Sequence, residues 1–250
     1  MMKFIHKTLL FIVLVVANNA FAQEKIAQNK PYIDLRKFHF GVFIGTHLQD
    51  IELMNVGPQQ ITNNQGITSE KLISVDQDRW DAGFNVGVLG EFRLNQTFQF
   101  RIAPAMYFGT RHFVFKNFTD LNEKGEPTEQ RQNLKTVYIA ATADLIFAAP
   151  RFNNYRPYLM LGASPMINLS GNDDDYIRLK PYDVFLEVGA GCDFYLPYFK
   201  LRPEIKFLYG LTNSYDTSHA DKMRNQDMRM YAGAIGSAQS KMIVLTFYFE

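Results

Sequence analysis

The chain of 250 residues has little of several features that define common protein classes. Cys192 is the single cysteine, which excludes an intrachain disulfide; it stands at an apolar position, where a small hydrophobic side chain fits. The formal net charge is only +1, which gives no argument for a nucleic-acid partner. Beyond the N-terminus no apolar run approaches the roughly 20 residues that a membrane-spanning helix needs. The sequence therefore argues against disulfide scaffolds, nucleic-acid binders and helical membrane proteins.

What the chain does have is a strong alternation of apolar and polar residues between positions 80 and 108. A period of two predicts β-strand, and the short turn at Asn95 and Gln96 predicts an antiparallel hairpin. Each strand has about ten residues, enough to cross a bilayer at a tilt. The sequence predicts a transmembrane β-barrel with its apolar face on lipid. That face carries Trp80, Ala82, Phe84, Val86, Val88, Phe92 and Leu94, then Phe98, Phe100, Ile102, Pro104, Met106 and Phe108.

The same alternation recurs along the chain and predicts an all-β fold, an antiparallel transmembrane barrel of about eight strands. The other strands are expected near residues 38–48, 136–147, 157–167, 183–194, 199–209 and 242–249. Long polar connections, such as 49–79, 110–132 and 212–239, alternate with short ones. Outer-membrane barrels have short periplasmic turns and long extracellular loops, so both termini are expected on the periplasmic side. An aromatic girdle is expected there, formed by Phe40, Phe92, Phe98, Phe100, Phe147, Phe194, Phe199 and Phe249.

The N-terminus has the features of an export signal rather than those of a structural element. Lys3 and Lys7 precede a short apolar run, and the small residues Ala20 and Ala22 fit a cleavage site. We therefore expect a signal peptide at 1–22, a loose periplasmic lead-in at 23–37 and an outer-membrane barrel at 38–250. The mature chain is expected to begin at Gln23.

The polar, inward positions of the predicted strands carry charged residues of both signs. A barrel of this size is filled by side chains, so opposite charges inside it are expected to pair and form a plug. A narrow pore or a proton path is the functional alternative. The predicted interior charge network consists of Glu91, Arg93, Arg101, Asp144, Glu187, Asp193, Lys200, Arg202, Glu204 and Lys206.

Three prolines argue against the membrane barrel. Pro104, Pro165 and Pro203 fall within predicted strands on the lipid-facing parity, where each removes a ladder hydrogen bond. Bulges are one way to absorb them, although an unpaired carbonyl in lipid is costly. The alternative fold is a soluble barrel of eight to ten strands, in which the inward parity is the apolar one.

Enzymatic and metal sites have little support in the sequence. His39 and His47 on the first strand and Ser164 on the fifth share the inward parity, which leaves a lipid-modifying hydrolase as an alternative. No G-x-S-x-G motif supports that alternative. The acidic run at 173–175 is expected to be a solvated loop tip because its spacing does not match a calcium loop. We expect no enzyme activity, metal, cofactor or small-molecule substrate.

Several segments together resemble the PorT-like outer-membrane β-barrel family of the Bacteroidetes, and the resemblance covers essentially the whole mature chain. They are the signal ending at 20–23, the strand patterns at 40–45, 83–88, 101–104 and 201–207, and the aromatic closing strand. The closing strand departs from the general outer-membrane pattern, because Glu250 follows the last aromatic residue, Phe249.

The resemblance implies a non-enzymatic component of the type IX protein secretion system. Such a component supports the export and surface attachment of cargo such as proteases or adhesins. The implied partners are outer-membrane lipid, lipopolysaccharide and other secretion subunits. A barrel this small does not itself pass folded protein. The alternative function is a generic OmpX-like barrel for adhesion or envelope stability.

Overall fold

The computed structural model describes residues 28–62, 68–171, 175–223 and 226–250. The predicted signal peptide, 1–22, and most of the acidic run lie outside these residues. A short 3-10 helix, η1 (Ile33–Leu35), precedes the strands. The strands are β1 (Phe38–Asn55), β2 (Pro58–Thr62), β3 (Thr68–Asp76), β4 (Asp81–Arg93), β5 (Phe98–Leu121), β6 (Pro127–Ala148), β7 (Tyr155–Asn168), β8 (Tyr182–Tyr195), β9 (Lys200–Gly210) and β10 (Ile235–Phe249). Two short helices, α2 (His219–Lys222) and α3 (Gln226–Ala232), lie between β9 and β10.

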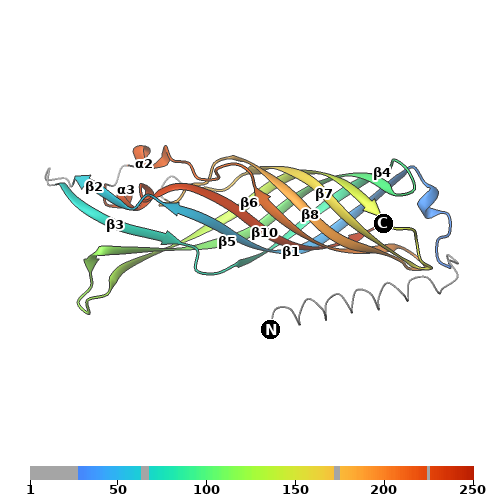
Figure 1. Cartoon of the computed structure of the whole chain (residues 1–250), viewed down its shortest axis with the longest axis horizontal. Coiled ribbons are helices and arrows are strands. Elements are labelled where there is room, and N and C mark those ends of the chain that lie inside the picture. Colours follow the sequence, from blue (N-terminus) through green and yellow to red (C-terminus); the bar gives the residue numbers. More distant parts are fainter. Residues whose placement is uncertain (1–27, 63–67, 172–174, 224–225) are drawn as a thin grey trace, which may run out of the picture.

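Eight of these strands close into an antiparallel barrel, as the sequence predicts. The sheet runs in the order β2-β3-β5-β4-β1-β10-β9-β8-β7-β6, and a pairing between β5 and β6 closes the circle. β2 and β3 lie outside the circle as a hairpin added to the far part of β5. Figure 1 shows the elongated barrel with this hairpin, α2 and α3 gathered at one end. We call that end the long-loop end and the opposite one, where the C-terminus lies, the short-turn end.

The two faces of the strands follow the predicted parities. On β1, Phe38, Phe40 and Val42 are exposed, whereas His39 and Phe43, which have the other parity, are buried. The same order holds around the barrel and gives it an apolar outer belt. No helix among the described residues is long and apolar enough to cross a membrane.

The three strand prolines are accommodated without bulges, which answers the argument against a membrane barrel. Pro104, Pro165 and Pro203 each stay paired on one side, opposite Ala141, Val184 and Phe247. On its other side each ladder skips the proline and resumes in the same register. Proline lacks only its N–H, so each costs the barrel a local gap on one side rather than a change of register.

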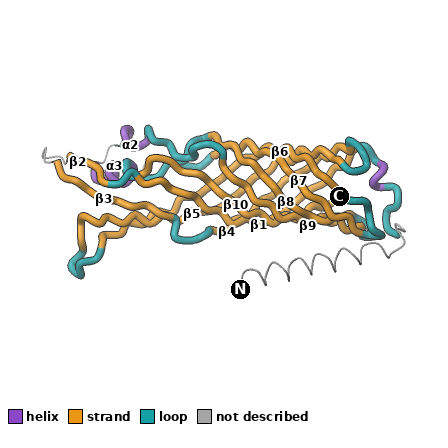
Figure 2. Tube along the Cα trace, in the orientation of Figure 1, coloured by secondary structure: helices purple, strands orange, loops and turns teal. Residues whose placement is uncertain are grey.

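The long-loop end differs from the expectation of polar loops. Much of the predicted loops at 49–79 and 110–132 is strand: β1 continues to Asn55, and β5 and β6 form a tall hairpin up to Leu121 and Pro127. The outer surface changes from apolar to polar at one level, where Asp50 pairs with Lys241. We call the described residues beyond this level the extension. They come from 50–79, 110–135, 169–181 and 211–241, and Figure 2 shows that strands make up much of this part.

Candidate functional site

The predicted charge network lies inside the barrel, toward the short-turn end. Nine of its ten members are buried, with side chains from β4, β5, β6, β8 and β9 converging there. The barrel is narrow enough for strands on opposite walls to share ion pairs. Arg101 on β5, for instance, pairs with Glu204 on β9, 103 residues away.

Arg202 is the centre of the layer nearest the short-turn end. Its guanidinium donates to both oxygens of Glu91 and both oxygens of Asp193, including Nη2 to Glu91 Oε1 at 3.2 Å and Nη2 to Asp193 Oδ2 at 3.3 Å. Glu250, the last residue of the chain, lies 3.4 Å from Arg202 Nη1 and also pairs with Lys200. Paired, hydrogen-bonded charges of this kind make burial tolerable.

Arg101 forms a second layer that shares a carboxylate with the first. Its Nη1 donates to Glu204 Oε2 at 2.7 Å, and its Nε donates to Glu91 Oε2 at 3.4 Å. The hydroxyls of Tyr158 and Tyr248 also donate to Glu204, at 2.6 Å and 2.9 Å. Because Glu91 accepts from both arginines, the two layers form one network.

The third layer contains the Lys206–Glu187 pair and Asp144, which lies beside Arg101. Lys206 Nζ lies 2.9 Å from Glu187 Oε2, and Asp144 Oδ2 lies 3.8 Å from Arg101 Nη1. Asp144 leans over Gly162 of β7, where an added Cβ would lie 2.1 Å from Asp144 Oδ1. Glycine at this position therefore makes room for the carboxylate inside the barrel.

Arg93 was wrongly placed in the network. It ends β4 at the rim, where its Nε donates to the Asn95 carbonyl at 3.3 Å and its Nη1 to the Leu35 carbonyl at 3.4 Å. The parity of Arg93 is inward, but the strand finishes before the side chain reaches the interior.

Glu250, Tyr158 and Tyr248 also belong to the network, although they were not predicted from the sequence. Their inward parity was the available signal, because Glu250 continues the alternation of the closing strand beyond Phe249.

The residues of the hydrolase alternative are not brought together. Ser164 Oγ lies 2.8 Å from Thr142 Oγ, and His39 Nδ1 lies 3.6 Å from Glu250 Oε2. His47 packs against the ring of Tyr107. Among the described residues, neither histidine hydrogen-bonds to Ser164, and no group of three His, Cys, Asp or Glu side chains is arranged to hold a metal.

We had expected a loose lead-in, but its described part closes the short-turn end. Asn29 N donates to Asn154 Oδ1 at 2.9 Å, and Arg151 donates to the carbonyls of Asn29 and Lys30. The Arg151 guanidinium also stacks 3.6 Å from the centre of the Tyr195 ring and pairs with Asp34 at 3.3 Å. These polar contacts hold the described part of the lead-in across the barrel mouth.

At the other end, the extension has an apolar core of its own. Phe113 and Phe115 of β5 point inward and are fully buried there. Tyr231 packs edge-on against Phe115, while the buried hydroxyl of Tyr215 donates to the Ala232 carbonyl. The remaining members are Ile51, Ile73, Val75, Leu134, Ile177, Leu179, Ala234, Ile235 and Ala238. This core covers the long-loop mouth of the barrel.

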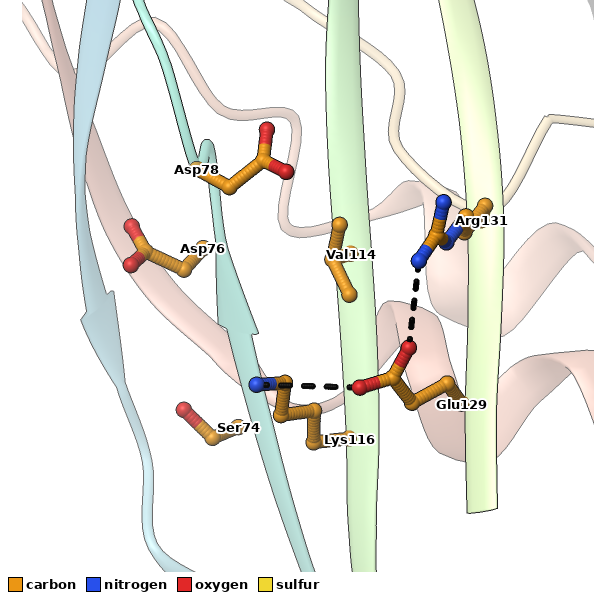
Figure 3. Close-up of a pocket in the computed structure, with 7 residues that line it drawn as sticks. All are labelled: Ser74, Asp76, Asp78, Val114, Lys116, Glu129 and Arg131. Atoms are coloured by element: carbon orange, nitrogen blue, oxygen red, sulfur yellow. Dashed lines mark hydrogen bonds and ion pairs between the residues drawn. The ribbon is translucent and has the colours of Figure 1, made fainter. Parts of the chain in front are cut away.

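The outer face of the extension carries a polar groove across β3, β5 and β6. A hollow of about 280 Å³ is lined by seven residues and continues into a second of about 310 Å³ through Asp78, Val114 and Arg131. Figure 3 shows Asp76 and Asp78 on one side, Glu129 and Arg131 on the other, and Val114 between them. Glu129 pairs with Lys116 at 3.7 Å and with Arg131 at 3.4 Å. The other lining residues are Ser74, Arg79, His112, Phe113 and Asn133.

Comparison with known proteins gives a family and several distant structural relatives. Residues 21–216 match the family model described as outer membrane protein beta-barrel domain. OprG of Pseudomonas aeruginosa is similar with a TM-score of 0.44 and 11% identity over 84% of this chain and 92% of OprG. Neisserial surface protein A has a TM-score of 0.40 and 12% identity over 85% of this chain and 98% of its own.

Ail of Yersinia pestis, the attachment invasion locus protein solved with the heparin analogue sucrose octasulfate, has a TM-score of 0.38 and 12% identity. The alignment covers 86% of this chain and 99% of Ail. Similarities of this size concern the fold alone. No curated protein matches the sequence significantly.

Proposed function

Because the chain belongs to the outer membrane protein β-barrel family, we propose that it works at the cell surface as a closed, non-enzymatic barrel for adhesion or envelope stability. Outer-membrane barrels turn their long loops outward, so the extension is extracellular and the lead-in periplasmic. The apolar belt contacts outer-membrane lipid and lipopolysaccharide. The working part on this proposal is the extension.

The observation that carries the proposal is that buried side chains of the described residues occupy the interior near both ends and in the middle. The lead-in covers the periplasmic mouth, the Arg202 network fills the barrel above it, and the apolar core of the extension covers the outer mouth. A barrel filled in this way offers no route for solutes, while strands that continue well past the belt present a rigid surface to the outside.

Two measurements test this function. In planar bilayers the purified protein should give no conductance steps, and regular steps would contradict a closed barrel. On cells, a strain lacking the protein should attach less to surfaces or resist envelope stress less well, and the full chain should restore it.

A shortened chain serves as the matched variant for the cell assay. Arg111 and Leu134 are register partners on β5 and β6, so a two-residue Asn-Gly turn can replace residues 112–133. This chain should still insert, shown by its heat-modifiable migration on gels, yet fail to restore attachment. Full attachment with the shortened chain would contradict a role for the extension.

The type IX secretion role remains a second proposal, supported by the resemblance of several strands to the PorT-like family. In this role the extension or the short turns contact other secretion subunits. Fractionation of a strain lacking the protein tests it: secretion cargo held in the periplasm with its C-terminal signal uncleaved is the expected result. Normal cargo on the surface would remove this role and leave the closed barrel untouched.

The lipid-modifying enzyme is the weaker alternative, because Ser164 contacts Thr142 rather than a histidine. Alanine substitution at His39, His47 and Ser164, followed by mass spectrometry of lipid A, should show no change. A changed lipid A would contradict the non-enzymatic proposal.

A further inference from the structure

The outer part of β6 has a strand neighbour on one side only. Its pairing with β5 runs from the Phe98–Phe147 pair outward to the Asn117–Thr128 pair. Its pairing with β7 ends at the Tyr138–Asn168 pair. Within the part of the chain that the structure describes, residues 128–135 therefore form a free edge of the sheet on the extracellular side.

The backbone groups that face this edge follow from the hydrogen bonds of the last paired residue. Val137 O accepts from Leu169 N at 2.8 Å, and Val137 N donates to Ser170 Oγ at 3.2 Å, so this residue points both groups toward β7. In a strand this direction alternates with each residue. The N–H and C=O groups that point to the free edge are therefore those of Glu129, Arg131, Asn133 and Lys135.

Another strand that continues into the extension, β10, has its unpaired side covered. β10 also continues beyond its partner β9, but its outer side is covered by the preceding loop. Ser214 N donates to Ala238 O at 2.9 Å, and Ala238 N donates to Asn213 Oδ1 at 2.9 Å. The corresponding groups of β6 have no such partner among the described residues.

The side chains along the free edge have a definite charge order. Because Glu129, Arg131, Asn133 and Lys135 share one parity, all four point outward, and the first three also line the polar groove. The Arg131 side chain is 75% exposed, and its hydrogen bond to Glu129, at 3.4 Å, is the only one it makes among the residues that the structure describes, so most of its guanidinium N–H groups remain available. An approaching strand meets, in order, a negative, a positive, a neutral and a positive side chain.

We infer that this edge accepts an extended segment of an extracellular polypeptide as an added antiparallel strand. Unpaired edge groups supply the backbone hydrogen bonds, and side chains on alternate positions supply specificity. Charge complementarity sets the sequence: acidic residues face Lys135 and Arg131, and a basic residue faces Glu129. The inference rests on the proposed function in one respect, the outward direction of the extension.

The probe is a fluorescent peptide built to this order, Glu-Val-Thr-Val-Glu-Thr-Lys, with its first residue opposite Lys135. The full chain in lipid nanodiscs should bind it saturably, as measured by fluorescence anisotropy. Two control peptides separate the contributions: one with the three charges reversed, and one with alternate backbone nitrogens methylated on the pairing side. Both should bind at least about tenfold more weakly, since several hydrogen bonds or charge contacts are lost.

Matched variants of the protein test the same edge. Asn133→Pro removes an N–H that faces the edge while leaving the ladder to β5 intact, because proline is tolerated where its missing N–H faces solvent. It should weaken binding about fivefold to tenfold, whereas Asn133→Ala, which keeps the N–H, should not. Arg131→Glu should lower affinity for the original peptide, and a Lys in the facing position of the peptide should restore it.

The outcomes separate this inference from the function it rests on. No saturable binding, or binding that neither methylation nor Asn133→Pro weakens, would overturn strand addition and leave the charged residues as protection against aggregation. Should Asn133→Pro fail to fold, shown by lost heat-modifiable migration, the Arg131→Glu exchange decides alone. Cells that lose attachment with the shortened chain while the peptide does not bind would retain the proposed function without this edge. Peptide binding without any attachment phenotype would retain strand addition at this edge and contradict the proposed role in attachment.

Discussion

The barrel and its extension are built from the same strands, yet the barrel buries a charge network where the extension buries an apolar core. At the edge of the belt on β1, Leu48 points outward to lipid and Gln49 is buried inside. In the next two residues, Asp50 points outward and Ile51 is buried. On β5, Arg101 is the inward residue at the belt, whereas Phe113 is the inward residue in the extension. The alternation continues, but the apolar and polar faces exchange places.

The reason is the solvent on the outer face. Where lipid covers the outside, apolar side chains are exposed to it, and the interior can hold a charge network beside buried apolar side chains such as Phe43 and Leu208. Where water covers the outside, the hydrophobic effect draws apolar side chains inward, as in a soluble protein. The boundary layer is polar on the inside: Arg111 Nη1 donates to Ser240 Oγ at 3.1 Å and Arg111 Nε to Gln49 Oε1 at 3.3 Å.

The largest expected effect comes from breaking the charged interior at its centre. Arg202→Met removes the cation shared by Glu91, Asp193 and Glu250, and unpaired buried carboxylates remain. We expect a loss of about 3–5 kcal/mol in the free energy of unfolding. Urea unfolding in lipid vesicles, followed by the loss of heat-modifiable migration, measures it.

Arg93→Met is the matched control. It makes the same substitution at an arginine that the sequence also assigned to the network but that lies at the rim. We expect a change of at most about 0.5 kcal/mol there. Equal losses for the two variants would contradict the distinction between a buried network and its rim.

A smaller and more local effect is expected from the apolar core of the extension. Phe113→Ala leaves a cavity among buried side chains and should cost about 3 kcal/mol. Because the core lies beyond the belt, the extension should open while the barrel stays inserted. Protease added to intact cells should then cut the extension faster, with unchanged heat-modifiable migration of the barrel.

Phe118→Ala is the control on the same strand, because Phe118 is 46% exposed. Its protease sensitivity should stay that of the wild type. A Phe113→Ala barrel that fails to insert would show that the two regions fold as one unit.

The exchange of faces also explains what the sequence analysis predicted and what it missed. The barrel, its closure by eight strands and the burial of nine charged residues follow from a constant parity over residues 38–48, 81–108 and onward. The strands of the extension were taken for loops because the apolar residues Phe113 and Phe115 have the other parity from Phe98–Phe108 in β5. Where the apolar residues of one strand change parity, the medium outside the strand changes from lipid to water. This change can be recognised in the sequence once the level of the belt is known.

Long-range contacts were the other limit. For Arg93 a local signal was available, because the predicted turn at Asn95 and Gln96 already placed this residue at the end of its strand. By contrast, the contacts of Arg151 with Asn29 and Lys30 join segments more than 120 residues apart, and neither segment has a regular pattern. Such contacts depend on which strand ends meet when the barrel closes.

An intermediate effect is expected from a single buried hydroxyl in the extension. Tyr215→Phe removes the hydrogen bond to the Ala232 carbonyl and should cost about 1 kcal/mol. Burial, with a smaller contribution from Asp216, raises the pKa of Tyr215 to about 12. The neutral form is thus favoured in the folded state, and its contribution, complete below the ordinary pKa of about 10, is lost as the pH rises toward 12.

The pH dependence gives this prediction its control. Protease sensitivity of the wild-type extension, measured after incubation at pH 9 and pH 12, should increase more than that of the Phe variant. An identical increase in both proteins would assign the alkaline opening to other groups.

The smallest effect on stability is expected from breaking an ion pair that is exposed to solvent instead of buried in the barrel. Lys116 and Glu129 lie 3.7 Å apart on the outer face of the extension, with side chains 50% and 41% exposed. Solvent screening and the entropy of two long side chains reduce such a pair to about 0.2–0.5 kcal/mol. A double-mutant cycle with Lys116→Met and Glu129→Gln should give a coupling of this size that falls in high salt. A coupling of several kcal/mol would mean that the groove is far less hydrated than its exposure implies, and that the contrast between the two regions lies in packing rather than in solvent.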